Sequence, residues 1–107
     1  MPMQDRISKD VPFLTALRRD LHAHPELGFE EERTSDIVAK LLEEAGVKIH
    51  RGLGKSGVVG TLQIGNGTRT IGLRADMDAL AMPEVAERPY KSTVAGKMHA
   101  CGHDGHT

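Results

Sequence analysis

The chain has 107 residues, a formal net charge of −1 and aromatic side chains at only 3% of its positions. A chain of this length forms one domain at most, with an aliphatic core. The balanced charge gives no electrostatic reason to expect binding to nucleic acid or to an anionic membrane. The single cysteine excludes an internal disulfide, and no apolar run approaches the roughly 20 residues of a membrane span. The N-terminus also lacks the pattern of a secretory signal, so we expect a cytoplasmic protein.

The first predicted helix begins at Asp10, which can cap it, and ends before Pro25. Its apolar stripe consists of Phe13, Leu14, Leu17 and Leu21. His22 and His24 lie at the C-terminal end, where an imidazole can bond to the exposed carbonyls. On chemistry alone we interpret both histidines as caps.

A second helix is predicted to start near Glu31 and to stop at Gly46. Its apolar face consists of Ile37, Val38, Leu41, Leu42 and Ala45. Glu43 and Glu44 fall on the opposite, solvated face, so we assign no acid–base role to them.

A sheet is expected after the second helix. Val47 and Ile49 alternate in a short strand, and Gly52, Gly54 and Gly57 mark a turn whose spacing fits no phosphate-binding loop. A second strand runs from Gly57 to Gly65. The Asn66-Gly67 pair then predicts a hairpin with a return strand over Thr68–Ala75.

Two aspartates, Asp76 and Asp78, follow this return strand. Ligands in open α/β sheets bind beyond the carboxyl ends of strands, so the pair is well placed to hold a metal or a ligand. A structural interpretation is equally open, in which Asp76 caps a turn and Asp78 pairs with Arg74. Residues 79–95 contain two prolines and no clear periodicity, which predicts an irregular loop.

The last dozen residues, Gly96–Thr107, contain the only cysteine and three of the six histidines. Cys101 and His103 are one residue apart, so both side chains can point the same way, and thiolate and imidazole are the ligands that zinc prefers. Asp104 and His106 add a carboxylate and an imidazole close by. His106 could be a ligand, support the ligands or begin a helix, and we rank the ligand role last. We expect His99 to play a supporting or structural role. The alternative is a buried cysteine beside solvated loop histidines.

Three stretches occur in the order Arg18–Glu31 (RRDLHAHPELGFEE), Leu73–Leu80 (LRADMDAL) and His99–Thr107 (HACGHDGHT). Together they resemble the signatures of the M20 family of metal-dependent peptidases and amidohydrolases. They are most similar to the branch of hippurate hydrolases, auxin-conjugate hydrolases and N-acyl-amino-acid deacylases. The resemblance implies an α/β fold, a partial three-layer α/β/α zinc-peptidase-like catalytic domain with two N-terminal helices followed by a sheet with a β-hairpin.

The resemblance also implies roles for individual residues. Cys101 and His103 correspond to metal ligands and Asp78 to the aspartate of the catalytic site. The stretch that contains His22 and His24 lies near the substrate site in the family, which implies a supporting active-site role as the alternative to capping. Asp76 stands where the wider family has a histidine ligand, so it is a weaker candidate, as are His99, Asp104 and His106. The chain departs from the branch at Ala81, where a proline is usual, whereas Glu84 falls at the expected place.

The implied reaction is hydrolysis of the amide bond of an N-acyl amino acid at a pair of divalent metals such as zinc, manganese, cobalt or nickel. The family completes its site with a glutamate pair, one of them the general base, and with two later histidines, none of which has a counterpart here. We therefore expect residues 1–107 to be the N-terminal part of the catalytic domain, inactive alone. The parent protein, with its dimerisation domain, is expected to act as a homodimer on small substrates.

An alternative from another class is a small metal-binding module. In it Cys101, His103 and His106 would close a structural zinc site together with Asp104 or His99. A single cysteine cannot provide the two separated knuckles of small zinc domains, which weakens this hypothesis. A metal-free interaction domain would leave the histidine cluster unexplained.

Overall fold

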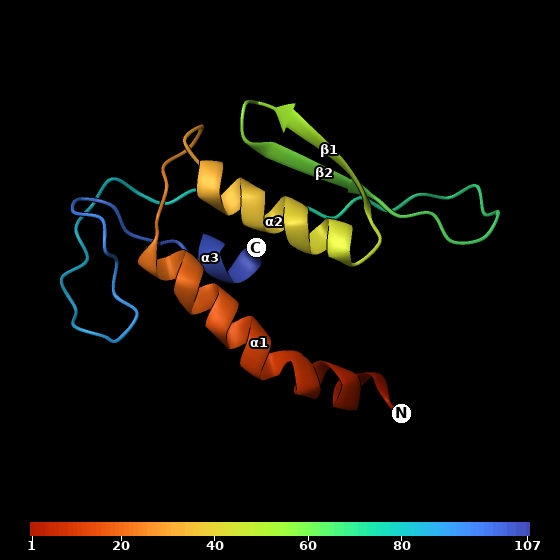
Figure 1. Cartoon of the computed structure of the whole chain (residues 1–107), viewed down its shortest axis with the longest axis horizontal. Coiled ribbons are helices and arrows are strands. Elements are labelled where there is room, and N and C mark those ends of the chain that lie inside the picture. Colours follow the sequence, from red (N-terminus) through yellow and green to blue (C-terminus); the bar gives the residue numbers. More distant parts are fainter.

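The computed structural model describes residues 1–107. Two helices, α1 (Met3–Ala23) and α2 (Glu32–Glu44), precede an antiparallel hairpin of β1 (Lys48–Leu53) and β2 (Gly57–Thr61), and a single helical turn, α3 (His103–His106), lies at the C-terminal end. In Figure 1, α2 lies between the hairpin and α1, and α3 lies beside α1. The predicted α/β class, with two N-terminal helices followed by a β-hairpin, is confirmed.

Helix α1 begins at Met3, so the predicted start at Asp10 is wrong. The first turn forms upstream because the amides of Asp5 and Arg6 bond to the carbonyl of Pro2. Pro12 is accommodated within the helix, at the cost of one backbone hydrogen bond. The end at Ala23 agrees with the break expected before Pro25. No helix of the structure is both long and apolar enough to cross a membrane.

Helix α2 is anchored at its N-terminus by the carboxylate of Glu26. This side chain accepts hydrogen bonds from the backbone amides of Arg33 and Thr34, at 2.9 and 2.7 Å. A carboxylate at a helix N-terminus satisfies free amides and interacts favourably with the helix dipole. At the other end Gly46 adopts a positive φ of 81° and stops the helix, as predicted.

The hairpin pairs Lys48 with Thr61 and His50 with Val59, and residues 54–56 form its turn, as the glycine spacing predicted. The predicted return strand over Thr68–Ala75 is absent. The chain does turn at Gly65 and Asn66, but the following residues pair with no strand. Ile71 and Leu73 are 85% and 96% exposed. An alternating pattern forms a strand only where a neighbouring edge supplies its hydrogen bonds, and here none does.

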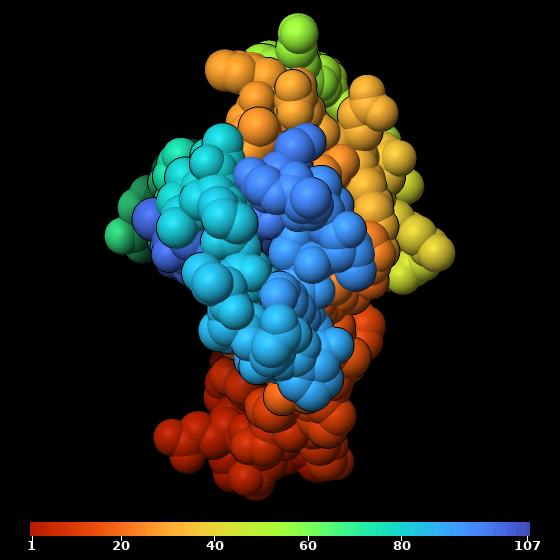
Figure 2. All heavy atoms as spheres, turned by 90° about the vertical axis from the view of Figure 1, so that its left-hand side faces the viewer, coloured from red at the N-terminus to blue at the C-terminus, as the bar shows by residue number.

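The interior of the molecule is mainly polar. The only buried apolar side chains apart from Pro25 are Leu21, Ala39 and Ala79. The buried polar residues are His22, Glu31, Thr34, Ser35, Glu84, His99 and Asp104. Several belong to the segment after residue 78, which contains no helix or strand before α3, as expected for an irregular loop. This segment covers the C-terminal end of α1 (Figure 2), where Thr93 bonds to the carbonyl of Ala23.

Candidate metal centre

Two hydrogen bonds to the backbone of residues 76–79 fix Asp76 and Asp78 beside α3. The amide of Ala79 donates to the carbonyl of Glu26 at 2.7 Å, which fixes the chain just after Asp78. The hydroxyl of Thr107 donates to the carbonyl of Asp76 at 2.9 Å, which ties the end of α3 to the same segment. Residues far apart in the sequence therefore meet at one place.

Three side chains, Asp76, His103 and His106, place ligand atoms within 4.8 Å of one another. Asp76 Oδ1 lies 2.6 Å from His106 Nδ1, and Asp76 Oδ2 lies 3.4 Å from His103 Nε2. Asp78 contacts the other nitrogen of His103, since its Oδ1 accepts a hydrogen bond from His103 Nδ1 at 2.8 Å. Because a carboxylate only accepts, this contact leaves Nε2 as the unprotonated atom of a neutral His103.

The electrostatics favour an ionised Asp76. The hydrogen bond from His106 holds the pKa of the Asp76 carboxyl below the ordinary value, and the hydrogen bond from Arg74 acts in the same direction. Arg74 Nη1 lies 3.2 Å from Asp76 Oδ2, so this arginine pairs with Asp76 and not with Asp78. An ionised carboxylate beside two imidazoles fits a divalent ion of the zinc type.

Cys101 is a free, exposed thiol just before α3, and its sulfur is not among the clustered ligand atoms. Its role as a ligand beside His103 stays a prediction. Gly102, with a φ of 86°, turns the chain between the two residues and starts α3. The structure thus joins His103 to Asp76, Asp78 and His106.

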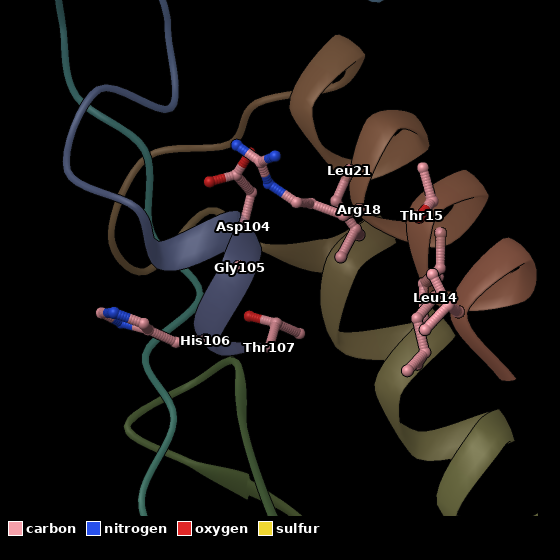
Figure 3. A pocket seen from close by; sticks show the side chains of 10 residues that line it. Leu14, Thr15, Arg18, Leu21, Asp104, Gly105, His106 and Thr107 are labelled. Atoms are coloured by element: carbon pink, nitrogen blue, oxygen red, sulfur yellow. The ribbon is translucent and has the colours of Figure 1, made fainter. Parts of the chain in front are cut away.

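Asp104 and His99 do not belong to this group of clustered ligand atoms. Asp104 is buried, and its Oδ2 receives a hydrogen bond from His22 Nδ1 at 2.9 Å and lies 3.5 Å from Arg18 Nε. Figure 3 shows Arg18 and Asp104 pointing toward one another between α1 and α3, while His106 leaves α3 in another direction. His99 is 5% exposed, and neither of its ring nitrogens has a protein partner. Burial lowers the pKa of His99 and so favours its neutral form.

The interpretation of His22 as a helix cap is wrong. Its side chain is buried, and its Nε2 lies 3.0 Å from both carboxylate oxygens of Glu84. Packing of the loop after residue 78 against α1 removes His22 from the solvent that a cap needs. His24 does cap the helix, because its Nδ1 bonds to the carbonyl of Asp20 at 2.8 Å.

Sequence reasoning assigned no role to Glu84, whose position was noted only by resemblance. The one local signal is its place in an irregular loop, directly after Pro83. Its buried contact with His22 spans 62 residues of sequence, so no pattern of spacing could reveal it.

The family model of peptidase family M20/M25/M40 matches residues 72–107, the segment that carries these aspartates and histidines. The chain belongs to the M20 family. It is 53% identical over 91 residues to a hippurate hydrolase of Campylobacter jejuni, covering 85% of this chain and 24% of the relative. It is 50% identical over 95 residues to an IAA-amino acid hydrolase of Arabidopsis thaliana, covering 89% of this chain and 21% of that protein.

Solved structures agree with this membership. The YXEP protein of Bacillus subtilis, described as a dinuclear metal binding peptidase from the M20 family, superposes with a TM-score of 0.83 at 42% identity. That alignment covers 89% of this chain and 27% of the other. A Staphylococcus aureus structure superposes with a TM-score of 0.90 at 34% identity, covering 95% of this chain and 27% of that one. The M20 chain described here thus spans about a quarter of the length of its relatives.

Proposed function

We propose that residues 1–107 are the N-terminal part of an M20 catalytic domain and supply part of a metal centre that hydrolyses the amide bond of N-acyl amino acids. The observation that carries the proposal is the convergence of Asp76, His103 and His106, with ligand atoms within 4.8 Å, behind which Asp78 holds the ring of His103. A carboxylate that fixes the orientation and tautomer of a ligating histidine is a recurrent feature of zinc sites.

The chain's own residues have separable tasks in this proposal. Divalent metals, when bound, polarise the amide carbonyl and lower the pKa of an attacking water. Asp78 keeps a proton on His103 Nδ1, so that Nε2 is free to bind. Asp76 adds a negative charge between the two imidazoles, and the exposed Cys101 would supply a sulfur donor. Zinc, manganese, cobalt and nickel all suit such mixed nitrogen, oxygen and sulfur donors.

The substrate class is supported by the relatives. One is named a hippurate hydrolase and another an IAA-amino acid hydrolase, and both names describe an acyl group joined to an amino acid by an amide. A small N-acyl amino acid is therefore the substrate we propose, with neither nucleic acid nor membrane as a partner. We place the whole enzyme in the cytoplasm as a homodimer.

The isolated chain should show no amidase activity. Glu84, the buried glutamate nearest in sequence to the cluster, is engaged by His22, Ser92 and Arg88 and is not free to act as a base. Hydrolysis of hippurate by this polypeptide with added Zn²⁺, Mn²⁺ or Co²⁺ should not exceed the rate with the metal alone. Turnover well above that control would refute the expectation.

The function itself can be tested in a hybrid protein. This chain would replace the aligned N-terminal segment of the Campylobacter jejuni hippurate hydrolase, and hydrolysis of hippurate would be measured. We expect an active hybrid, with kcat lowered about 10- to 100-fold by Asp78→Asn, because the amide disturbs the tautomer of His103. The matched control is His50→Asn, on the exposed face of β1. A folded, metal-loaded hybrid without activity would show that the proposed function is wrong.

The metal-binding module has less support. A closed structural site needs four ligands, and Asp104, one of those it would use, is occupied by His22 and Arg18. Tight, four-coordinate zinc in this chain alone would nevertheless favour the module over the enzyme.

A further inference from the structure

We propose that His22 is a positioning residue of the metal centre, acting through Asp104. This inference rests on the proposed function. His22 would hold Asp104, and Asp104 would hold the helical turn that carries His103 and His106. Neither His22 nor Glu84 would touch the metal or the substrate.

The three side chains form a buried charged network. His22 Nδ1 lies 2.9 Å from Asp104 Oδ2, and His22 Nε2 lies 3.0 Å from the oxygens of Glu84. Only 4% of the His22 side chain and 1% of each carboxylate remain exposed. Because carboxylates only accept, a doubly protonated imidazole is the form that donates to both at once. Removing His22 would take a hydrogen-bond donor from both buried carboxylates at once.

The far end of the network is fixed to the loop. The amide of Ser92 donates to Glu84 Oε1 at 2.7 Å, and Arg88 Nε lies 3.1 Å from Oε2. Ser92 in turn bonds through its hydroxyl to the carbonyls of Val94 and Lys97. Burial raises the pKa of Glu84, but the hydrogen bonds from His22 and Ser92 outweigh it and leave the pKa below the ordinary value. Glu84 is therefore a firmly held, ionised anchor.

At its other end, the network reaches α3 through Asp104, and α3 is too short to be stable by itself. Helix α3 contains only four residues, follows Gly102 and includes Gly105. A single turn is far below the length at which a helix is stable in water, and glycine weakens it further. Asp104 is its only buried residue. Asp104 therefore anchors α3 to α1 through its contacts with His22 and Arg18.

Small movements of α3 matter because Asp104 immediately follows His103 and stands two residues before His106. A site of this kind requires its groups to be held within about 0.5 Å. Rotation or loss of the turn would separate His103 from Asp78 and His106 from Asp76, which now lie 2.8 and 2.6 Å apart. The buried network thus links the placement of α1 to the geometry of the metal ligands.

Two near-isosteric substitutions distinguish positioning from general stabilisation. The amide nitrogen of asparagine occupies roughly the place of histidine Nδ1, whereas that of glutamine occupies the place of Nε2. His22→Asn therefore keeps a donor toward Asp104 and loses the contact with Glu84. His22→Gln does the reverse. Both replace a buried imidazole with an amide, so both should lower the stability of the metal-free chain.

The test uses the 107-residue chain, with Co²⁺ binding followed by visible absorption and calorimetry, and with thermal unfolding of the metal-free protein followed by circular dichroism. We expect His22→Gln to weaken Co²⁺ binding at least about 10-fold and His22→Asn to weaken it by less than about 3-fold. His50→Gln and His50→Asn, on the exposed face of β1, serve as controls and should change neither quantity.

Equal losses of affinity in the two variants, or no loss in either, would overturn the positioning role while leaving the proposed function standing. An unaltered chain that binds no Co²⁺ would overturn the proposed function and this inference with it. Should His22→Gln fail to fold, Asp104→Asn and Asp104→Ala provide the same decision. The asparagine keeps an acceptor for His22 and should bind Co²⁺ at least about 10-fold more tightly than the alanine.

Discussion

At the scale of single residues, the most informative side chains are those whose two polar ends face different elements. His103 donates to Asp78 from one ring nitrogen and faces Asp76 with the other, and His22 joins Asp104 to Glu84 through its two ring nitrogens. An imidazole is suited to this because its two nitrogens are rigidly separated and chemically distinct. One histidine therefore binds at the centre and the other supports it.

The ionised Glu84 should make the stability of the chain depend on acid pH. Its folded-state pKa lies below the unfolded value of about 4.3. More protons are thus bound in the unfolded state, so the contribution is complete above that value and is lost as pH falls through the lower folded-state pKa. Glu84→Gln should flatten the acid limb of a plot of unfolding midpoint against pH. Glu87→Gln, an exposed neighbour, should leave the limb unchanged, and an unaltered limb in Glu84→Gln would contradict the argument.

At the scale of the elements, boundaries follow local chemistry where the chain itself supplies the signal. Pro25 and Gly46 end the two long helices close to the predicted places. The start of α2 depends instead on Glu26, several residues upstream of the helix. That carboxylate also accepts the hydroxyl of Thr34 at 2.6 Å, so it organises a buried corner between α1 and α2.

Glu26→Ala should therefore destabilise α2. Two amides of the first turn would lose their acceptor, and a cap of this kind contributes about 1 kcal/mol. The urea midpoint, followed by circular dichroism at the helix band, should fall in proportion. Glu43→Ala, on the exposed end of the same helix, is the matched control. Equal midpoints for the two variants would show that Glu26 does not act as a cap.

At the scale of the whole molecule, much apolar surface is exposed to solvent. A groove between α1, α2 and β2 is lined by Leu17, Ile37, Val38, Leu41, Leu42, Val47, Val58, Leu73 and Met77, among others. Few apolar side chains are fully buried, and the extended segment around Ile71 and Leu73 exposes more. Burial of apolar area is the main favourable term in folding, so the chain should be only marginally stable.

We therefore expect the 107-residue chain to bind a hydrophobic dye such as ANS and to unfold with a low enthalpy. Calorimetry should give less than the roughly 0.7 kcal/mol per residue of typical globular domains near 60 °C. Saturating Co²⁺ should raise the unfolding temperature, because a ligand of the native state stabilises it by mass action. A full-sized enthalpy and no dye binding would contradict this account of the core.

The sequence by itself determined what depends on neighbours along the chain. It predicted the α/β class, the ends of the long helices, the turn of the hairpin and the family, because prolines, glycines and motif residues act locally. Only the tertiary structure decided which side chains meet. The return strand failed because no edge was there to pair with it, and His22 left its role as a cap because a distant loop buried it against Asp104 and Glu84. Such contacts join residues that are far apart in the sequence, so a local sequence pattern cannot predict them.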